Sequence, residues 1–197
     1  MILENLCKAY NDTKVLKDIN YKFYNNKITA ILGPSGCGKT TLLNIISGLE
    51  KATSGKITVN TRNISYMFQE DRLIPWLSVY ENVAFVLKSN YKKPKINGLV
   101  RKYLELVDLK EYAYETIDKL SGGMKRRVSM ARALAYDSEL LLLDEPFKGM
   151  DDELKMNIIS KFLSKWKDNK NTVIFVTHDE KEVKELAQVT FRLAKCK

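Results

Sequence analysis

Residues 33–40 read Gly33-Pro34-Ser35-Gly36-Cys37-Gly38-Lys39-Thr40 and match the pattern G-x-x-x-x-G-K-[ST]. Residues 27–32 before them read as a strand. The apolar residues after them recur at helical spacing: Leu42, Leu43, Ile45, Ile46 and Leu49. Glycines in such a loop let backbone N–H groups curl around a phosphate, and the helix adds the positive end of its dipole. This stretch, the phosphate loop, therefore predicts a site for the phosphates of a nucleotide.

Four side chains in and after this loop have predicted roles. Lys39 is expected to neutralise the β- and γ-phosphate oxygens, and the hydroxyl of Thr40 is placed to bind Mg²⁺, which prefers oxygen ligands. Thr41 is expected to reach the α-phosphate. The thiol of Cys37, helped by nearby positive charge, is a candidate for a modification that blocks nucleotide binding.

Two carboxylates end a continuous apolar run that reads Leu140-Leu141-Leu142-Leu143-Asp144-Glu145. Such a run is typical of a strand buried on both faces, and ligands bind at the carboxyl edge of an open α/β sheet. Asp144 is expected to hold Mg²⁺ through water, and Glu145 to act as general base on an attacking water molecule. The alternative is a surface Asp-Glu pair that follows a core strand without a chemical role.

Length and composition limit the class of protein. The 197 residues are 45% hydrophobic and 29% charged, which predicts one globular domain, residues 1–197. No apolar run approaches the roughly 18 to 20 residues of a membrane-spanning helix, and the first five residues lack the pattern of a secretory signal, so a cytoplasmic location is expected. The three cysteines lack C-x-x-C spacing, which argues against a disulfide framework and a structural zinc site.

The net charge favours anionic partners. Lys plus Arg is 33 and Asp plus Glu is 24, so the formal charge is 33 − 24 = +9. A positive field of this size suits nucleotides, nucleic acid or the inner membrane leaflet. The alternative is codon bias in an AT-rich genome, since Lys greatly outnumbers Arg.

The remaining pattern predicts an α/β fold with a parallel sheet covered by helices. Strand patterns occur at residues 19–23, 27–32, 64–68, 140–143 and 173–176. Helical spacing extends from about Val79 to Val107, with a predicted break over the basic, Pro- and Gly-containing residues 90–98. We expect a small antiparallel part near the N-terminus and a helical subdomain inserted near residues 70–135.

A second glycine turn opens a helix at Leu120-Ser121-Gly122-Gly123-Met124, and it predicts a second anion site. With this stretch, the signature loop, the chain resembles the ATP-binding cassette (ABC) ATPases over nearly its whole length. The resemblance implies the P-loop NTPase core and a dimer in which the signature loop reaches the γ-phosphate held by the partner's phosphate loop. ATP and Mg²⁺ are the cofactors it implies.

Four more residues match positions of that family. The resemblance implies that Tyr10 stacks on adenine, that Gln69 reaches Mg²⁺ and water, that His178 is the switch histidine, and that Asp151 belongs to a loop crossing the dimer. The implied metal ligands are therefore Thr40, Gln69 and Asp144. Without the resemblance, Tyr10 also reads as an ordinary half-buried tyrosine and Gln69 as an ordinary polar residue at a strand end.

A narrower resemblance, to ATPases of nitrate, sulfonate and taurine importers, rests on residues 67–83, which begin Met67-Phe68-Gln69-Glu70-Asp71-Arg72-Leu73-Ile74-Pro75-Trp76-Leu77. It implies an importer at the cytoplasmic face of the membrane, with a permease and an extracytoplasmic solute-binding protein as partners. The apolar residues Leu73, Pro75, Trp76 and Leu77 are expected to accept a short helix of the permease. The alternative is that Trp76 simply packs inside the helical subdomain.

The function expected is that of a peripheral subunit that hydrolyses ATP as a head-to-tail dimer around two MgATP and drives transport of a small solute. Nucleic acid is not an expected partner. One alternative is a non-transport ABC ATPase acting on nucleic acid or ribosomes, and another is a nucleotide-binding scaffold with little hydrolysis. The chain departs from the family at Lys148-Gly149-Met150 and is short between Lys56 and Gln69, and no C-terminal regulatory domain is expected after His178.

Overall fold

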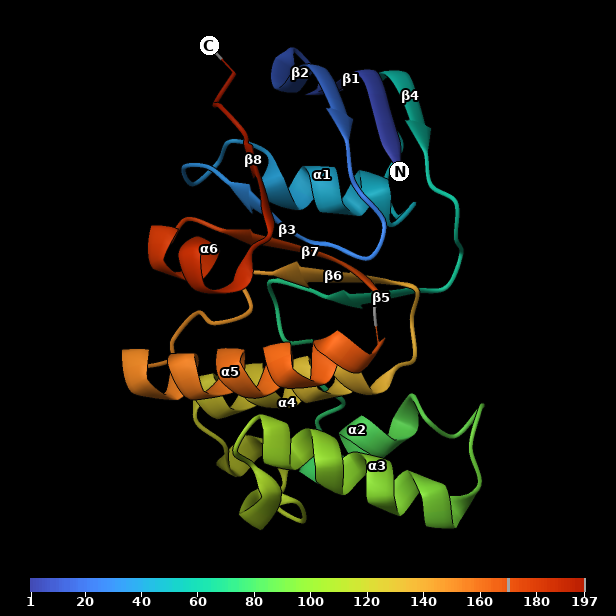
Figure 1. Ribbon diagram of the computed structural model, residues 1–197, viewed down its shortest axis with the longest axis vertical. Helices are drawn as coiled ribbons and strands as arrows, with labels where there is room; N and C mark the ends of the chain where they lie inside the picture. The colour runs from blue at the N-terminus through green and yellow to red at the C-terminus, as the bar shows by residue number, and fades with distance from the viewer. Residues whose placement is uncertain (170, 197) are drawn as a thin grey trace. The chain divides into compact units, whose positions relative to one another are not determined.

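The computed structural model describes residues 1–169 and 171–196, which divide into two compact units (Figure 1). The first unit contains Met1–Tyr66, Glu139–Glu145 and the described residues of Lys170–Lys197. The second contains Met67–Ser138 and Pro146–Asn169. No helix among residues 1–169 and 171–196 combines the length and the apolar character that crossing a bilayer demands.

An antiparallel sheet in the order β2-β1-β4 forms the N-terminal part of the first unit. Its strands are β1 (Ile2–Tyr10), β2 (Thr13–Lys22) and β4 (Ser54–Thr58). β1 and β2 form a hairpin in which Tyr10 pairs with Thr13, and several register shifts bend β1 along its length. Leu3 and Leu6 of β1 and Leu16 of β2 are buried, which fixes one face of this sheet against the core.

The second sheet of this unit has the order β5-β6-β7-β3-β8. Its strands are β3 (Ile28–Leu32), β5 (Ile64–Met67), β6 (Leu140–Asp144), β7 (Thr172–Thr177) and β8 (Val189–Arg192). All residues of β3 and β6 are buried, because continuous apolar runs suit strands that are covered on both faces.

Parallel pairing brings the ends of three strands to one edge of this sheet. Leu32 at the end of β3 pairs with Thr177 of β7, and Asp144 at the end of β6 pairs with Val176 of β7. The residues that follow these strands, Gly33, Glu145 and His178, therefore emerge at the same carboxyl edge. This is the edge at which the sequence predicted a site.

Two helices complete the first unit. α1 (Lys39–Ile46) follows the phosphate loop and buries Leu42, Leu43 and Ile46 in a core that includes side chains from both sheets. α6 (Glu180–Leu186) begins after His178, with the carboxylate of Asp179 accepting a hydrogen bond from the N–H of Lys181. Together with the helical second unit, this arrangement confirms the predicted α/β fold class.

The second unit is helical. Its helices are α2 (Val79–Phe85), α3 (Lys93–Leu106), α4 (Gly122–Ala135) and α5 (Asp152–Asn169), with short 3-10 helices at Lys110–Tyr112 and Ile117–Lys119. α2, α3 and α4 contact one another around the fully buried valines Val83, Val100 and Val128. Besides the residues near 70–135, this unit includes α5, whose Lys161 Nζ lies 3.7 Å from Asp108 Oδ1.

The predicted break over residues 90–98 is wrong for its second half. α3 begins at Lys93, with Pro94 in its first turn. Proline is tolerated there because the first turn of a helix leaves its N–H groups without intrahelical partners. Gly98 lies inside the helix and faces open space, so it weakens the helix without ending it.

Candidate functional site

The phosphate loop joins β3 to α1, as its sequence predicts, and it depends on two of its glycines. A Cβ at Gly33 would lie 2.4 Å from the carbonyl oxygen of Leu193, which follows β8. Gly38 caps α1 in the left-handed region at φ 98°, and a Cβ there would meet Val15 and Leu16 of β2. The loop therefore fits closely between neighbouring strands only because both positions lack a side chain.

Lys39 is held inside this loop. Its Nζ donates hydrogen bonds to the carbonyl oxygens of Gly33, at 2.7 Å, and Pro34, at 2.9 Å. The side chain is buried, and Thr40 and Thr41 follow it in the first turn of α1. The ammonium group is thus fixed at the carboxyl edge of the sheet, beside the backbone that is predicted to cradle phosphate.

The structure does not support a reactive thiol at Cys37. The side chain is 1% exposed and belongs to the apolar core of the first unit. A buried thiol in apolar surroundings behaves as a small hydrophobic group and is chemically inert. The sequence failed here because position in a loop does not reveal the direction of a side chain.

Asp144 and Glu145 differ in environment although they are adjacent. Asp144 ends β6 and is 1% exposed, whereas Glu145 adopts a left-handed backbone conformation at φ 48°. The N–H of Glu145 donates a 3.0 Å hydrogen bond to the carbonyl of Val176 on β7, and this contact holds the unusual turn. A strained backbone at a non-glycine residue is typical of sites where the direction of a side chain matters.

Glu145 and His178 form a pair. His178 Nδ1 lies 3.4 Å from Glu145 Oε1, and the imidazole is well exposed while the carboxylate is mostly covered. The two residues come from the ends of adjacent parallel strands, β6 and β7. The structure thus brings together the predicted general base and the predicted switch histidine.

A buried hydrogen-bond network supports the turn that carries His178. The hydroxyl of Thr177 donates to Glu182 Oε2 at 2.6 Å, and the Thr177 hydroxyl oxygen in turn accepts the N–H of Asp179 at 3.0 Å. Glu182 lies on α6 and is almost fully buried. The residues on both sides of His178 are therefore fixed from beneath through one carboxylate.

The first unit offers oxygen ligands for a magnesium ion. Mg²⁺ binds through one or two carboxylates, the phosphates of its nucleotide and several waters, so a dense protein cage is not required. The buried carboxylate of Asp144 and the hydroxyl of Thr40 fit that donor set. Within residues 1–169 and 171–196, no group of three or more His, Cys, Asp or Glu side chains forms an all-protein cage.

Tyr10 ends β1 and is 45% exposed. Lys8 Nζ lies 4.7 Å from the centre of its ring and forms a 2.9 Å ion pair with Glu50. Burial and a hydrogen bond to Glu50 raise the pKa of the Tyr10 hydroxyl, against a hydrogen bond to Thr41 that lowers it. Burial would raise the pKa of Glu50, but hydrogen bonds from Tyr10 and Lys8 lower it overall.

The signature loop lies in the second unit and begins α4. The hydroxyl of Ser121 caps the helix by accepting the N–H of Met124 at 3.3 Å. A Cβ at Gly123 would lie 3.0 Å from the carbonyl oxygen of Gly149, so the loop closely approaches the turn before Asp151. Asp151 caps α5 by accepting the N–H of Leu154 at 2.9 Å.

The residues Lys148-Gly149-Met150, where the sequence departs from the family pattern, form a simple turn. Gly149 is in the left-handed region at φ 77°, which suits glycine, and Lys148 is exposed. The turn ends with Met150 N donating to the carbonyl of Phe147. Two predicted nucleotide-contacting loops, those of Ser121 and Asp151, are therefore neighbours within the second unit.

Gln69 belongs to a segment that α4 holds from the side. Arg126 Nη1 donates to the carbonyl oxygens of Phe68, at 2.6 Å, and Gln69, at 3.0 Å, and lies 3.2 Å from Asp71 Oδ1. Arg132 donates to the carbonyl oxygens of Asp71 and Arg72. The backbone beside Gln69 is thus attached to the helix that begins at the signature loop.

Among the next residues, 73–77, Trp76 is 80% exposed. The alternative in which Trp76 packs inside the helical subdomain is therefore wrong. The side chain of Asn82, which is fully buried, accepts the N–H of Ile74 and donates to the carbonyls of Ile74, Leu77 and Ser78. The exposed indole thus stands on an ordered loop.

Several supporting residues were missed by sequence reasoning. They are Lys8, Glu50, Asn82, Arg126, Arg132 and Glu182. Glu182 acts through the hydroxyl of nearby Thr177, and the others act through a contact with a distant part of the chain or with a backbone group. The only available signal was a polar or charged residue next to a recognised motif, as with Lys8 before Tyr10 and Glu182 after His178.

Comparisons with known proteins show the family to which the chain belongs. The family model described as ABC transporter matches residues 16–148. The spermidine/putrescine import ATP-binding protein PotA of Fusobacterium nucleatum is 41% identical over 189 residues, which cover 90% of this chain and 50% of that protein. The aliphatic sulfonates import ATP-binding protein SsuB of Bacillus cereus is 40% identical over 181 residues, 87% of this chain and 70% of that protein.

A solved structure of an ATP-binding cassette has the same fold. The dimeric post-hydrolysis state of the ATP-binding cassette MJ0796 bound to ADP and Pi matches with a TM-score of 0.89 and 28% identity, over 98% of this chain and 93% of that one. The chain spans only about half the length of some curated relatives, such as PotA. Because the family model covers well over half of its 197 residues, the chain belongs to the ABC transporter family.

Proposed function

We propose that this chain is the ATP-binding and ATP-hydrolysing subunit of an ABC importer. One observation supports this proposal above all: the phosphate loop, Glu145 and His178 emerge at the ends of parallel strands β3, β6 and β7, with Glu145 Oε1 3.4 Å from His178 Nδ1. A phosphate cradle, a carboxylate base and an orienting imidazole at one sheet edge are the parts that hydrolysis of a phosphoanhydride requires.

The chemistry proposed needs little covalent participation by the protein. Backbone N–H groups of the phosphate loop and the ammonium of Lys39 bind the β- and γ-phosphates. Glu145 orients a water molecule and accepts its proton as the oxygen attacks the γ-phosphorus; the bond to the β-phosphate oxygen breaks, and ADP and phosphate leave. His178 holds the carboxylate of Glu145 in place. Thr40 and Asp144 would hold Mg²⁺, which neutralises charge on the phosphate oxygens when bound.

We propose further that two copies of the chain close head to tail on two ATP molecules. Ser121 is exposed at the start of α4, and the N-terminal end of a helix favours an anion. A Cβ at Gly123 would lie 3.0 Å from the carbonyl oxygen of Gly149, so the turn before Asp151 is close to the signature loop. The match to a dimeric cassette at 28% identity supports this arrangement. Tyr10 would stack on adenine, and Gln69 would reach the metal and the attacking water.

The proposed membrane partner is a permease at the cytoplasmic face of the membrane, together with an extracytoplasmic solute-binding protein. Trp76 at 80% exposure, on a loop ordered by Asn82, fits the acceptor of a short helix from such a permease. For the cargo, residues 67–83 favour the nitrate, sulfonate and taurine branch, and the 40% identity to the sulfonate importer subunit SsuB supports it. PotA and CysA, named for polyamine and sulfate import, match about as well, so we assign a small solute as the cargo class.

The test is Mg²⁺-dependent ATP hydrolysis measured against protein concentration, with the mass of the complex followed in parallel. We expect activity to rise more steeply than linearly and Glu145→Gln to form a stable ATP-bound dimer. Glu185→Gln, an exposed change on α6, is the matched control and should behave as wild type. A chain that binds ATP but hydrolyses none, alone or with its permease, would contradict the proposal and favour a scaffold.

A further inference from the structure

The far end of β1 carries a charged group that the proposed chemistry does not use. Lys8 lies two residues before Tyr10, on the same face of the strand. Its ammonium is 2.9 Å from Glu50 Oε1 and donates a 2.9 Å hydrogen bond to the carbonyl of Lys51. The two side chains are only 14% and 20% exposed, so this pair is better shielded from water than an ordinary surface ion pair.

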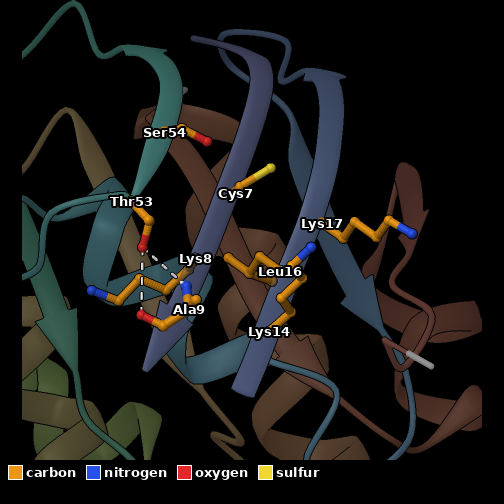
Figure 2. A pocket seen from close by; sticks show the side chains of 8 residues that line it. All are labelled: Cys7, Lys8, Ala9, Lys14, Leu16, Lys17, Thr53 and Ser54. Carbon is orange, nitrogen blue, oxygen red and sulfur yellow. Dashed lines mark hydrogen bonds between the residues drawn. The ribbon is translucent and has the colours of Figure 1, made fainter. Parts of the chain in front are cut away.

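A nearby cavity does not explain the orientation of the Lys8 side chain. The cavity, of about 190 Å³, lies over the antiparallel sheet and is lined by Cys7, Lys8, Ala9, Lys14, Leu16, Lys17, Thr53 and Ser54. Figure 2 shows Lys8 and Lys17 extending in opposite directions from it. Lys8 and Lys17 therefore do not face a common ligand, and the ammonium of Lys8 lies 2.9 Å from Glu50 Oε1 instead.

Tyr10 is positioned by a contact with its ring and by contacts with the residue before it. Lys8 Nζ lies 4.7 Å from the ring centre, within the range of a cation–π contact. Glu50 and Thr41 act on the pKa of the ring hydroxyl in opposite directions, Glu50 upward and Thr41 downward. Thr53 holds the preceding residue, since its hydroxyl accepts the N–H of Ala9 at 3.0 Å and lies 3.4 Å from the carbonyl of Ala9, as the dashed lines in Figure 2 show.

These contacts leave the tyrosine with two unlike faces. Lys8 covers one face, while the side chain as a whole remains 45% exposed. A cation on one face draws the π electrons of the ring toward it, which reduces repulsion between the opposite face and the π electrons of a stacked purine. A ring already fixed in place also loses less conformational freedom when a base binds.

We propose that Lys8, braced by Glu50, is a positioning residue that orients and polarises Tyr10 for stacking of the adenine base. This inference rests on the proposed role of Tyr10 in nucleotide binding. The ion pair thereby acts on binding of the base and not on binding of the phosphates.

The experiment compares two ligands that differ only in possessing a nucleoside. MgATP and magnesium triphosphate are titrated into wild type, Lys8→Met, Lys8→Arg and Tyr10→Ala. Lys8→Met keeps most of the apolar stem but removes the charge, and we expect it to weaken ATP binding about fivefold and to leave triphosphate binding unchanged. Lys8→Arg, which keeps a cation over the ring, should retain ATP affinity within about twofold.

Two controls separate positioning from charge and folding. Lys17→Met removes the same charge from an exposed position of the same sheet and should change neither affinity. In the Tyr10→Ala background, Lys8→Met should have no further effect on ATP binding, because the ring through which it acts is gone. Thermal unfolding of each variant checks that the sheet is intact, and Glu50→Gln provides a second way to loosen the ion pair.

Each contrary result has a distinct meaning. Equal weakening of both ligands by Lys8→Met, or no weakening of ATP, would overturn the inference. An additive effect in the Tyr10→Ala background would overturn it as well. A wild-type chain that binds triphosphate as tightly as ATP would remove the base-stacking role of Tyr10, whereas a chain that binds neither ligand would contradict the proposed function itself.

Discussion

The guanidinium of Arg126 donates a 2.6 Å hydrogen bond to the carbonyl oxygen of Phe68, the residue before Gln69. Arg126 lies on α4, which begins after Ser121, so one buried side chain connects the helix of the signature loop to the segment after β5. Its ion pair with Asp71 and its bond to the carbonyl of Gln69 use the same nitrogen. Within the second unit, two motifs that are far apart in sequence are therefore mechanically joined.

Arg126→Met should destabilise the protein by about 2 to 4 kcal/mol, because it leaves a partly buried carboxylate at Asp71 and two backbone carbonyls without their donor. Urea unfolding measures this loss. Lys125→Met, one residue earlier on the same helix, removes the same charge and should cost about 0.5 kcal/mol or less. Equal losses for the two variants would show that charge, and not the contacts of Arg126, is responsible.

Glu145→Gln should lower the rate of ATP hydrolysis by about 10² to 10⁴, because an amide cannot accept the proton of the attacking water. ATP affinity should change little. Single-turnover hydrolysis and equilibrium binding separate the two quantities. A variant that hydrolyses ATP at the wild-type rate would remove Glu145 from its proposed role.

Glu182→Ala should reduce hydrolysis about tenfold with little change in KM, because the turn carrying His178 loses the acceptor of the 2.6 Å bond from Thr177. Glu182→Gln keeps an acceptor oxygen and should retain most of the activity. Steady-state kinetics at several ATP concentrations gives the two parameters. Glu185→Ala, on the exposed side of the same helix, should match wild type.

Replacing glycine with alanine should change the stability of the protein in opposite directions at Gly33, in the first unit, and at Gly98, in the second. Gly33→Ala should abolish tight nucleotide binding and destabilise the fold by about 1 to 3 kcal/mol, since its Cβ would lie 2.4 Å from the carbonyl oxygen of Leu193. Gly98→Ala, inside α3 and facing open space, should stabilise the fold by about 0.5 to 1 kcal/mol. Chemical denaturation of both variants makes the comparison.

Lys165 should make stability depend on pH. Burial lowers the pKa of Lys165 to about 7, with Lys102 lowering it further and Asp137 opposing the shift. Its Nζ lies 3.1 Å from the centre of the Tyr103 ring. Because the unfolded chain keeps the ordinary lysine pKa of 10.5, it binds more protons than the folded chain between about pH 7 and that value, and this group adds stability as the pH rises through that window.

Lys165→Met should therefore raise the unfolding temperature more at pH 6 than at pH 9. Thermal unfolding at both pH values measures the difference. Lys167→Met, near the end of the same helix and exposed, should show no such dependence. If the two variants respond alike, the buried ammonium does not carry the effect.

The sequence predicted β3, β5, β6 and β7 of the second sheet, because an unbroken apolar run such as Leu140–Leu143 is typical of a buried strand. It missed β8, whose residues alternate between partly buried and exposed. The same reasoning predicted a site at the edge of the sheet where Gly33, Glu145 and His178 emerge. The start of α3 was misplaced, since the proline at its first turn reads equally well as a break.

The supporting contacts of the site could not be predicted in the same way. The ion pair of Lys8 with Glu50 and the bonds of Arg126 to backbone carbonyls depend on how distant segments meet, and backbone acceptors leave no trace in a sequence. The burial of Cys37 is also a matter of side-chain direction. Local patterns identify which residues stand at the site, whereas tertiary packing decides how they are held.

The left-handed backbone of Glu145, at φ 48°, also has an evolutionary consequence. Holding a non-glycine residue in this region costs about 1 to 2 kcal/mol, a strain that asparagine or glycine would relieve. Selection for stability alone would therefore drive this position away from glutamate. A descendant of this chain that no longer needed hydrolysis would be expected to lose Glu145 early and to become more stable as it did so.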